Sequence, residues 1–276
     1  MFINIITGDI DRGIIKRKKI YLLFIAAVIL LCIVTTMKLE SMMALGKVHG
    51  ECSVADLYMI FYKGSNIMNP GDGKLIYLTE QYLFLSLGMA YIIGNYAAKD
   101  LKGFGLQVIL RSRSAGLWWF GKLVWCVISG IIAHITIYIT MIFICIIKGW
   151  SLGFSVNAEV LKALGYKNSD IMVSAGNLLV ICILIPFLSV LALSVLQMFV
   201  SLLISPVVSL LLVTVEMLAA IYSNSAVFLS NGIMFVRNSM FYAGGTNSFY
   251  MILSSLIFIF LITFVGIFYF SKIDFL

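Results

Sequence analysis

Charged residues are scarce in this sequence. They make up 11% of its 276 residues, whereas hydrophobic residues make up 62% and the mean hydropathy is +1.09. Soluble domains carry about 25% charged and roughly 45–50% apolar residues, so this composition excludes an ordinary soluble domain. Because about 20 apolar residues cross a bilayer as a helix, the chain can hold several spans. We predict a single all-α integral membrane domain over residues 1–276.

The sequence also lacks the motifs of an ATPase and of common hydrolases. Its nearest approach to the phosphate-binding pattern GxxxxGK[ST] is Gly73-Lys74, which is followed by Leu75. Neither GxSxG nor HExxH occurs, and only one cysteine, Cys52, lies outside an apolar run, so no CxxC metal site can form. We expect no catalytic residue, no metal and no cofactor on this chain. Membrane topology explains the net charge of +7, so no nucleic-acid partner is expected.

Six apolar runs fit membrane spans. The first follows the basic residues 16–19 and has no signal-peptide cleavage site after it, so we predict an uncleaved span. Pro186 should kink the fourth span, and Pro206 suits the first turn of the fifth. The predicted spans are residues 20–37, 79–98, 120–147, 174–200, 204–222 and 249–270.

Lysine and arginine are concentrated in the short segments that share a side with the N-terminus. The positive-inside rule places such segments in the cytoplasm, so both termini are predicted to be cytoplasmic in a multi-pass protein of the bacterial cell membrane. Lys122 is among these cations. The segment 38–78 is the longest outside segment, and we expect it to be a solvated connector.

Residues 1–19 are predicted to form an amphipathic cytoplasmic helix. Apolar and polar positions recur at helical spacing on different faces, so the helix should lie along the inner membrane surface. It can dock a partner, or it can be an anchor that only fixes orientation through its basic residues. The apolar positions are Ile3, Ile6, Ile10 and Ile14, and the polar ones are Asp9, Arg12 and Lys16.

The loop of residues 99–116 mixes apolar and basic residues. Between Leu106 and Arg113 the spacing permits two helical turns with Leu106, Ile109 and Leu110 on one side. A Ser/Gly break and a tryptophan pair suited to the membrane interface follow. We predict a short cytoplasmic helix that docks on another protein.

Six spans, an amphipathic N-terminal helix and this loop together resemble the type-2 family of ABC exporter permeases. The resemblance covers the whole chain in layout and is motif-specific over residues 99–122. It implies that the loop contains the coupling helix, which inserts into a cleft of a separate ATPase subunit. This loop lacks the proline that many members carry, and its acidic residue is Asp100. The implied coupling residues are Phe104, Leu106, Gln107, Ile109, Leu110, Arg111 and Arg113.

The segment 223–248 has one charge, Arg237, and is too apolar for a solvated loop. Ser230-Asn231-Gly232 and Gly244-Gly245 interrupt it too often for a full span, so we predict a re-entrant or interfacial helix pair. The alternative is a loop lying flat on the lipid. Type-2 permeases are similar here, with short helices that close the outer end of the pathway. The candidate gate residues are Phe235, Arg237 and Phe241.

Polar residues inside spans are functional candidates, because a charge at the bilayer centre costs roughly 2.5–3.5 kcal/mol on insertion scales. Glu216 lies in the fifth span and His134 in the third, while Gln197 and Asn177 add polarity to the fourth. Glu216 and His134 can form a pair that lines a cavity. Alternatively, neighbouring serine, threonine or carbonyl groups satisfy each of them separately.

These features favour a transmembrane permease subunit of a type-2 ABC transporter over an enzyme. The resemblance implies two ATPase subunits that bind ATP-Mg, and a second permease subunit, identical or similar. The expected activity is export of lipophilic or amphipathic cargo, such as a peptide, an antibiotic or a lipid, and therefore a role in resistance. The alternative is a stand-alone membrane immunity or sensor protein that binds a peptide without transport.

Overall fold

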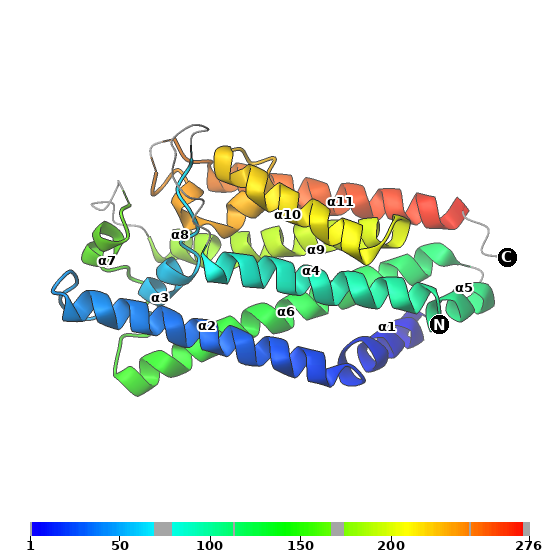
Figure 1. Cartoon of the computed structure of the whole chain (residues 1–276), viewed down its shortest axis with the longest axis horizontal. Coiled ribbons are helices and arrows are strands. Elements are labelled where there is room, and N and C mark those ends of the chain that lie inside the picture. Colours follow the sequence, from blue (N-terminus) through cyan, green and yellow to red (C-terminus); the bar gives the residue numbers. More distant parts are fainter. Residues whose placement is uncertain (1, 69–78, 113, 167–173, 243, 273–276) are drawn as a thin grey trace.

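The computed structural model of the chain is an all-helical bundle (Figure 1), and it describes residues 2–68, 79–112, 114–166, 174–242 and 244–272. The principal helices are α1 (Phe2–Ile10), α2 (Lys18–Ala44), α3 (Val54–Phe61), α4 (Glu80–Leu101), α5 (Phe104–Ser112), α6 (Ala115–Lys148), α7 (Ala158–Ala163), α8 (Ala175–Leu179), α9 (Ile185–Leu203), α10 (Pro206–Tyr222) and α11 (Ser248–Lys272). Two π-helical turns, η1 (Asp11–Ile15) and η2 (Val180–Leu184), and two 3₁₀ turns, η3 (Leu229–Ile233) and η4 (Phe235–Arg237), connect them.

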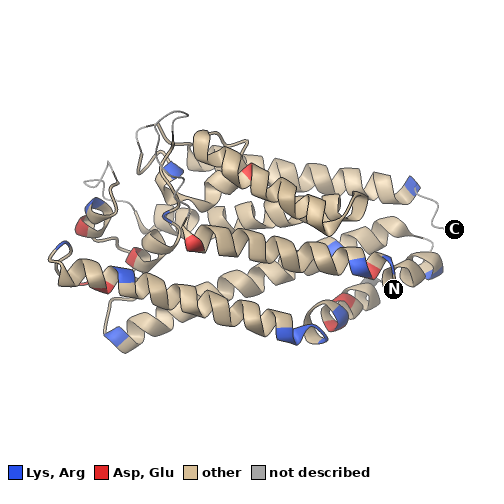
Figure 2. Cartoon of the chain, viewed as in Figure 1, with Lys and Arg blue, Asp and Glu red and all other residues tan. Residues whose placement is uncertain are grey.

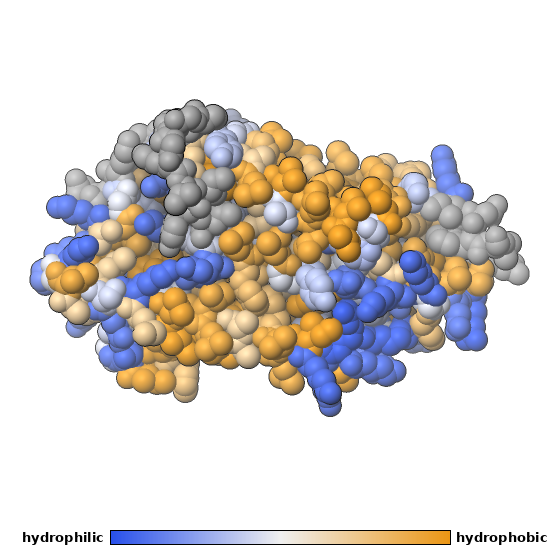
Figure 3. All heavy atoms as spheres, viewed as in Figure 1, coloured by the Kyte–Doolittle hydropathy of each residue, from blue (hydrophilic) through white to orange (hydrophobic). Residues whose placement is uncertain are grey.

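Within the described residues, four helices are long and apolar enough to cross a membrane. They are α2, α6, the continuous helix Ala175–Leu203 and α11. Charged residues gather mainly at the two ends of the bundle, and an apolar surface lies between them (Figures 2 and 3). This distribution is that of a membrane protein, because a bilayer core of about 30 Å excludes charge.

The other two predicted spans form helices with different properties. α10 has 17 residues, a rise of about 26 Å, which is short of a bilayer core of about 30 Å. α4 has 22 residues but carries Glu80, Lys99 and Asp100, and it is buried against α9, α10 and α2. Protein contacts therefore cover much of α4, and Tyr91 on its open side is 53% exposed.

α1, α5 and the last turn of α11 lie at one end of the bundle, which we call the near end (Figure 1). α3, α7 and the turns η3 and η4 lie at the opposite end, the far end. α9 occupies the centre and packs against α4, α6, α10, α11 and η3. The near end is therefore built from the first helices and the loop 99–116, and the far end from the connections.

The predicted position of Pro206 in the first turn of a helix is confirmed, and a change of helix type precedes Pro186. The helix 175–203 is interrupted by the π-helical turn η2, which ends just before Pro186 in the first turn of α9. Proline at this position removes a backbone donor, so the helix changes its hydrogen-bonding pattern in the preceding turn. Pro206 begins α10, and the Ser205 hydroxyl caps it by accepting from the Val208 amide at 3.2 Å.

The described part of segment 38–78 differs from the predicted solvated connector. α2 continues to Ala44, and every residue of α3 is buried. The side chains of residues 54–61 are almost all apolar, and they pack between α2, α6 and η2. Residues 69–78 lie outside the described residues.

The segment after α10 also differs from the prediction, because its described residues form two short 3₁₀ turns instead of a helix pair. Both turns are buried at the far end. Gly232 lies so close to the Ser189 hydroxyl and Ile185 of α9 that no larger side chain fits there. At this glycine the backbone of η3 packs directly on α9.

Candidate functional site

Lys122, in the second turn region of α6, is a buried cation. Its side chain is 1% exposed, and its Nζ lies 2.6 Å from Oδ2 of Asp100 and also forms an ion pair with Oδ1 of Asp9. Both carboxylates are as buried as the ammonium group. A buried charge without partners is strongly unfavourable, so α6 requires both acidic residues to hold this lysine inside.

Arg12 completes what we call the near-end charge cluster, formed by Asp9, Arg12, Asp100 and Lys122. Its Nε lies 3.8 Å from Oδ1 of Asp100 and its Nη2 lies 3.9 Å from Oδ1 of Asp9. The guanidinium carbon is 3.6 Å from the ring centroid of Phe104, the first residue of α5. Two anions and two cations give the cluster no net charge, which lowers the cost of burying it.

Neutral donors bind the same carboxylate oxygens that pair with Lys122. The Tyr96 hydroxyl donates to Oδ1 of Asp9 at 2.8 Å, and the Trp118 indole donates to Oδ2 of Asp100 at 3.1 Å. Burial raises the pKa of the Asp9 carboxyl above its ordinary value, while Lys122 and the Tyr96 hydroxyl oppose that rise. The cluster therefore joins α1, η1, α4 and α6 through ion pairs and hydrogen bonds, and the contact of Arg12 with the Phe104 ring links α5 to it.

Two glycines allow the helices around the cluster to approach closely. A Cβ on Gly105 of α5 would lie 2.7 Å from both the Asp100 carbonyl oxygen and the Trp118 indole nitrogen. A Cβ on Gly121 of α6 would lie 2.7 Å from Cγ2 of Ile5. Ordinary carbon contacts need about 3.5–4.0 Å, so Gly105 requires glycine, whereas a side chain at Gly121 would require Ile5 to move.

The inward face of α1 is not its isoleucine stripe. Ile5, Asp9 and Gly13 are buried, whereas Ile3 is 72% exposed. A residue of the predicted polar face, Asp9, is therefore buried, and it forms an ion pair with Lys122 of α6. The isoleucine stripe is only partly covered.

α5 forms where the loop 99–116 was predicted to be helical, but a different face is buried. Gly105 and Ile109 point inward, Leu106 is half-buried, and Leu110 is 46% exposed. The approach of Gly105 to Asp100 fixes this rotation of the helix. Among the implied coupling residues, Phe104, Gln107, Leu110 and Arg111 are exposed, and Arg113 lies outside the described residues.

A groove of about 310 Å³ lies between α1 and α5 at the near end. It combines apolar and polar side chains that face out of the bundle. The lining residues are Asn4, Ile5, Phe104, Gln107, Val108, Arg111 and Ser112.

The three gate candidates come together at the far end. The rings of Phe235 and Phe241 are stacked with centroids 6.5 Å apart, and Phe241 also contacts Tyr166 at 5.3 Å. Phe235 is linked to the segment after α3, because its amide donates to the Tyr62 carbonyl oxygen at 2.8 Å. The three side chains are buried within the subunit.

Arg237 is wholly buried and is bound by backbone carbonyl groups. Its Nε donates to the Ser65 carbonyl at 2.9 Å, and its Nη2 donates to those of Asn66 at 3.2 Å and Ile221 at 3.1 Å. Among the described residues no carboxylate forms an ion pair with it. Arg237 therefore connects η4 to the chain after α3 and to the end of α10.

Asp56, a buried carboxylate at the far end, is likewise bound by backbone groups. Asp56 of α3 accepts from the Ser53 amide and from the Asn157 amide, each at 2.8 Å. The Ser53 hydroxyl in turn accepts from the amides of α3, which completes a capping box. The segment before α7 is therefore attached to the start of α3.

The structure does not bring Glu216 and His134 together. Oε1 of Glu216 accepts from the Ser230 amide of η3 at 3.1 Å. Nδ1 of His134 lies 3.0 Å from the Gly130 carbonyl oxygen in its own helix, and its ring contacts Phe187 edge to face. The second predicted alternative therefore holds for one atom of each side chain, whereas Oε2 of Glu216 and Nε2 of His134 are buried without a hydrogen-bond partner among the described residues.

Gln197 and Asn177 have different environments. Gln197 is buried, donates to the Pro206 carbonyl oxygen at 3.4 Å and packs on Gly94 of α4. It therefore lies at the junction of α4, α9 and α10. Asn177 is exposed in the first turn of α8, where its backbone N–H donates to the Ser174 hydroxyl.

The sequence interpretation missed the near-end charge cluster. Lys122 was counted only as a cytoplasmic cation, although it stands in the aromatic run from Trp118 to Trp125. A single cation within such a run indicates that the cation is buried with an acidic partner, so the position of Lys122 in the sequence could have indicated its burial. The identity of that partner required the fold, because Asp9 is 113 residues away.

In the part of the chain that the structure describes, no group of three or more His, Cys, Asp or Glu side chains is arranged to hold a metal ion. All five cysteines are free thiols in buried positions. No family model, no curated protein and no solved structure matches the chain.

Proposed function

We propose that this chain is the transmembrane permease subunit of a type-2 ABC exporter, with six spans and both termini in the cytoplasm. In this proposal the near end faces the cytoplasm, and α5 is the coupling helix that contacts a separate ATPase. The cargo is lipophilic or amphipathic. The observation that carries the proposal is the attachment of an exposed, short helix, α5, to the bundle through a buried charge cluster.

The exposed surface of α5 suits a docking helix. Phe104 and Leu110 are 43% and 46% exposed although both are large and apolar. Gln107 and Arg111 lie beside them along the groove to α1. Apolar anchors with a polar surround are typical of protein interfaces, and this surface lies at an end of the bundle where lipid would not cover it.

The near-end charge cluster supports a mechanical role for α5. A force applied to Phe104 reaches Arg12 through the cation–π contact, and Arg12 lies beside the two carboxylates that hold Lys122. Movement of α5 would therefore move α1, α4 and α6 together. In a transporter this unit would transmit ATPase closure to the spans, because a packed ionic unit does not deform independently of its neighbours.

The second candidate is a stand-alone membrane immunity or sensor protein that binds a peptide. The far end favours it through the extensive cross-links between α3, α7 and the 3₁₀ turns, since a rigid outer surface is suited to recognition. This candidate needs no ATPase, and that requirement distinguishes it from the permease.

The test is purification of the tagged protein from its native host in mild detergent, with partners identified by mass spectrometry. We expect an ATPase in stoichiometric amount with the wild type. The variant Leu110→Asp should reduce its recovery about tenfold or more, because it places a charge in the apolar surface of α5.

The matched control is Ile15→Asp, which introduces the same charge at an exposed near-end residue outside α5. Ile15 is 57% exposed, and this variant should retain the ATPase. Recovery of the wild type without an ATPase would favour the stand-alone protein. Equal retention by both variants would contradict the role of α5.

A further inference from the structure

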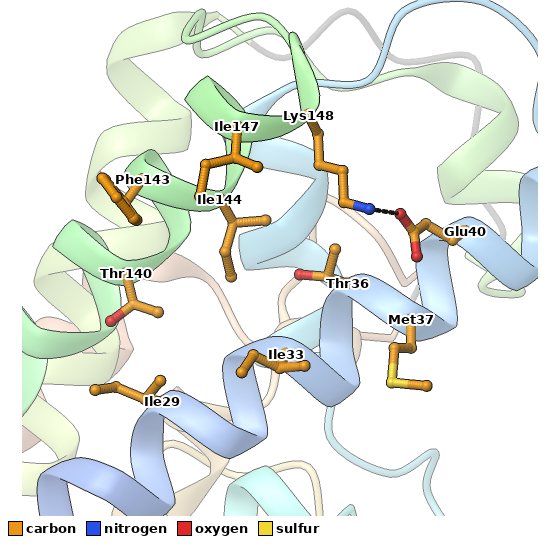
Figure 4. Close-up of a pocket in the computed structure, with 10 residues that line it drawn as sticks. All are labelled: Ile29, Ile33, Thr36, Met37, Glu40, Thr140, Phe143, Ile144, Ile147 and Lys148. Atoms are coloured by element: carbon orange, nitrogen blue, oxygen red, sulfur yellow. Dashed lines mark ion pairs between the residues drawn. The ribbon is translucent and has the colours of Figure 1, made fainter.

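A second groove lies between α2 and α6 towards the far end, and Figure 4 shows its lining. Its volume is about 410 Å³. Side chains from the two helices form its walls and remain accessible, with Met37 61% and Phe143 61% exposed. The apolar lining residues are Ile29, Ile33, Met37, Phe143, Ile144 and Ile147.

The charges of this groove are confined to one mouth. Nζ of Lys148 lies 2.5 Å from Oε1 of Glu40, and the two side chains are 43% and 41% exposed. Figure 4 shows this ion pair at the end of the groove, with the apolar side chains extending away from it. The Thr36 hydroxyl donates to its own helix at the Cys32 carbonyl, so it adds no free polar group.

The dimensions match a single hydrocarbon chain in one leaflet. From Ile29 to Glu40 the helix rises about 16 Å, roughly half of a bilayer core of about 30 Å. An acyl chain is slender enough to lie along this length, and apolar side chains of both helices line it.

We propose that this groove binds one acyl chain of a phospholipid whose headgroup is zwitterionic and carries a primary amine. The lipid phosphate pairs with Lys148 and the ammonium group with Glu40. The chain then extends along α2 and α6 towards Ile29. An anionic headgroup without an amine has only one of these two contacts, and Glu40 repels it.

This proposal follows from the position of the groove on two helices that are long and apolar enough to cross a membrane. It is independent of the proposed transport function. Its charge arrangement also disfavours a second copy of the chain as the occupant, because a protein surface would bury the Glu40–Lys148 pair without replacing its hydration.

The experiment is native mass spectrometry of the delipidated protein after addition of equal amounts of phosphatidylethanolamine and phosphatidylglycerol. We expect one retained phosphatidylethanolamine with the wild type. Ile144→Trp fills the groove and should lower that retention about tenfold or more. The matched control is Ile139→Trp, because Ile139 is on the same helix, is 61% exposed and does not line the groove.

Glu40→Gln tests the headgroup and should abolish the preference for phosphatidylethanolamine, because it removes the carboxylate that pairs with the ammonium group and repels the anionic lipid. If Ile144→Trp does not yield folded protein, Ile33→Trp fills the same groove from α2 and should show the same loss. Equal retention of both lipids by the wild type would overturn the proposal, as would unchanged retention in the filled variants. A lipid-free dimer that the filled variants dissociate would assign the groove to a second copy and also overturn it.

Discussion

The two ends of the bundle bury charged side chains in opposite ways. At the near end, Asp9 and Asp100 face Lys122, and formal charges of both signs cancel. At the far end, Arg237 donates to three carbonyl oxygens, and Asp56 accepts from two backbone amides. The first arrangement joins side chains of helices, whereas the second joins a side chain to irregular backbone.

The difference follows from what each end has to connect. Helices have satisfied backbone groups, so a helix can be attached to another helix only through its side chains. The connections at the far end leave carbonyl and amide groups without helical partners, and a buried charge can bind several of them at once. Ionic cross-links therefore occur between helices here, and charge–backbone cross-links occur between loops.

The most damaging single change should be Lys122→Met. It leaves two carboxylates buried with Arg12 as their one remaining cation, and breaking a buried pair on one side costs about 3–5 kcal/mol. Unfolding by denaturant in detergent micelles measures this loss. The double variant Lys122→Met/Asp100→Asn keeps one anion and one cation and should recover part of it. A single variant as stable as the wild type would mean that the cluster contributes nothing to folding.

Arg237→Met should have the next largest effect. It leaves three carbonyl groups at the far end without their donor, at a cost of about 2–3 kcal/mol, and the loss is smaller because no buried counter-charge is left behind. The same unfolding measurement applies. Lys47→Met removes an exposed cation and should change stability by less than about 0.5 kcal/mol. If the two variants lost equal amounts of stability, the carbonyl contacts of Arg237 would not be what stabilises the far end.

Gly105→Ala should cost about 1–3 kcal/mol, because its methyl group would overlap the Asp100 carbonyl and the Trp118 indole. Gly103→Ala is the matched control in the same loop, since the nearest atom to a Cβ there is 3.6 Å away. We expect that control to change stability by less than about 1 kcal/mol. Thermal unfolding midpoints distinguish the two variants. A larger loss of stability for Gly103→Ala than for Gly105→Ala would contradict the close packing of α5.

Local patterns predicted much of the architecture. Helical apolar runs, the proline at the start of α10, and a short helix in the loop 99–116 all depend on residues close in sequence. The rotation of α5 did not follow from such a pattern, because it depends on the contact of Gly105 with Asp100 and Trp118.

The candidate site was predictable only in outline. Residues 99–116 were identified, but the burial of Asp9 was not, because an acidic residue on the polar face of a short helix is normally solvated. α3 was missed because residues 38–78 were treated as one hydrophilic stretch, although the part at 54–61 is apolar. Long-range pairing determines both features, and a single sequence contains little information on it.

The contact of Arg237 with the Ser65 carbonyl joins residues 172 positions apart, and this separation has a consequence during synthesis. At about 5–20 residues per second, roughly 10–30 s pass between the emergence of the two segments. Through that interval the residues after α3 exist without the arginine that binds their carbonyl groups. The nascent protein therefore has to retain an unfinished far end until nearly the whole chain has been translated.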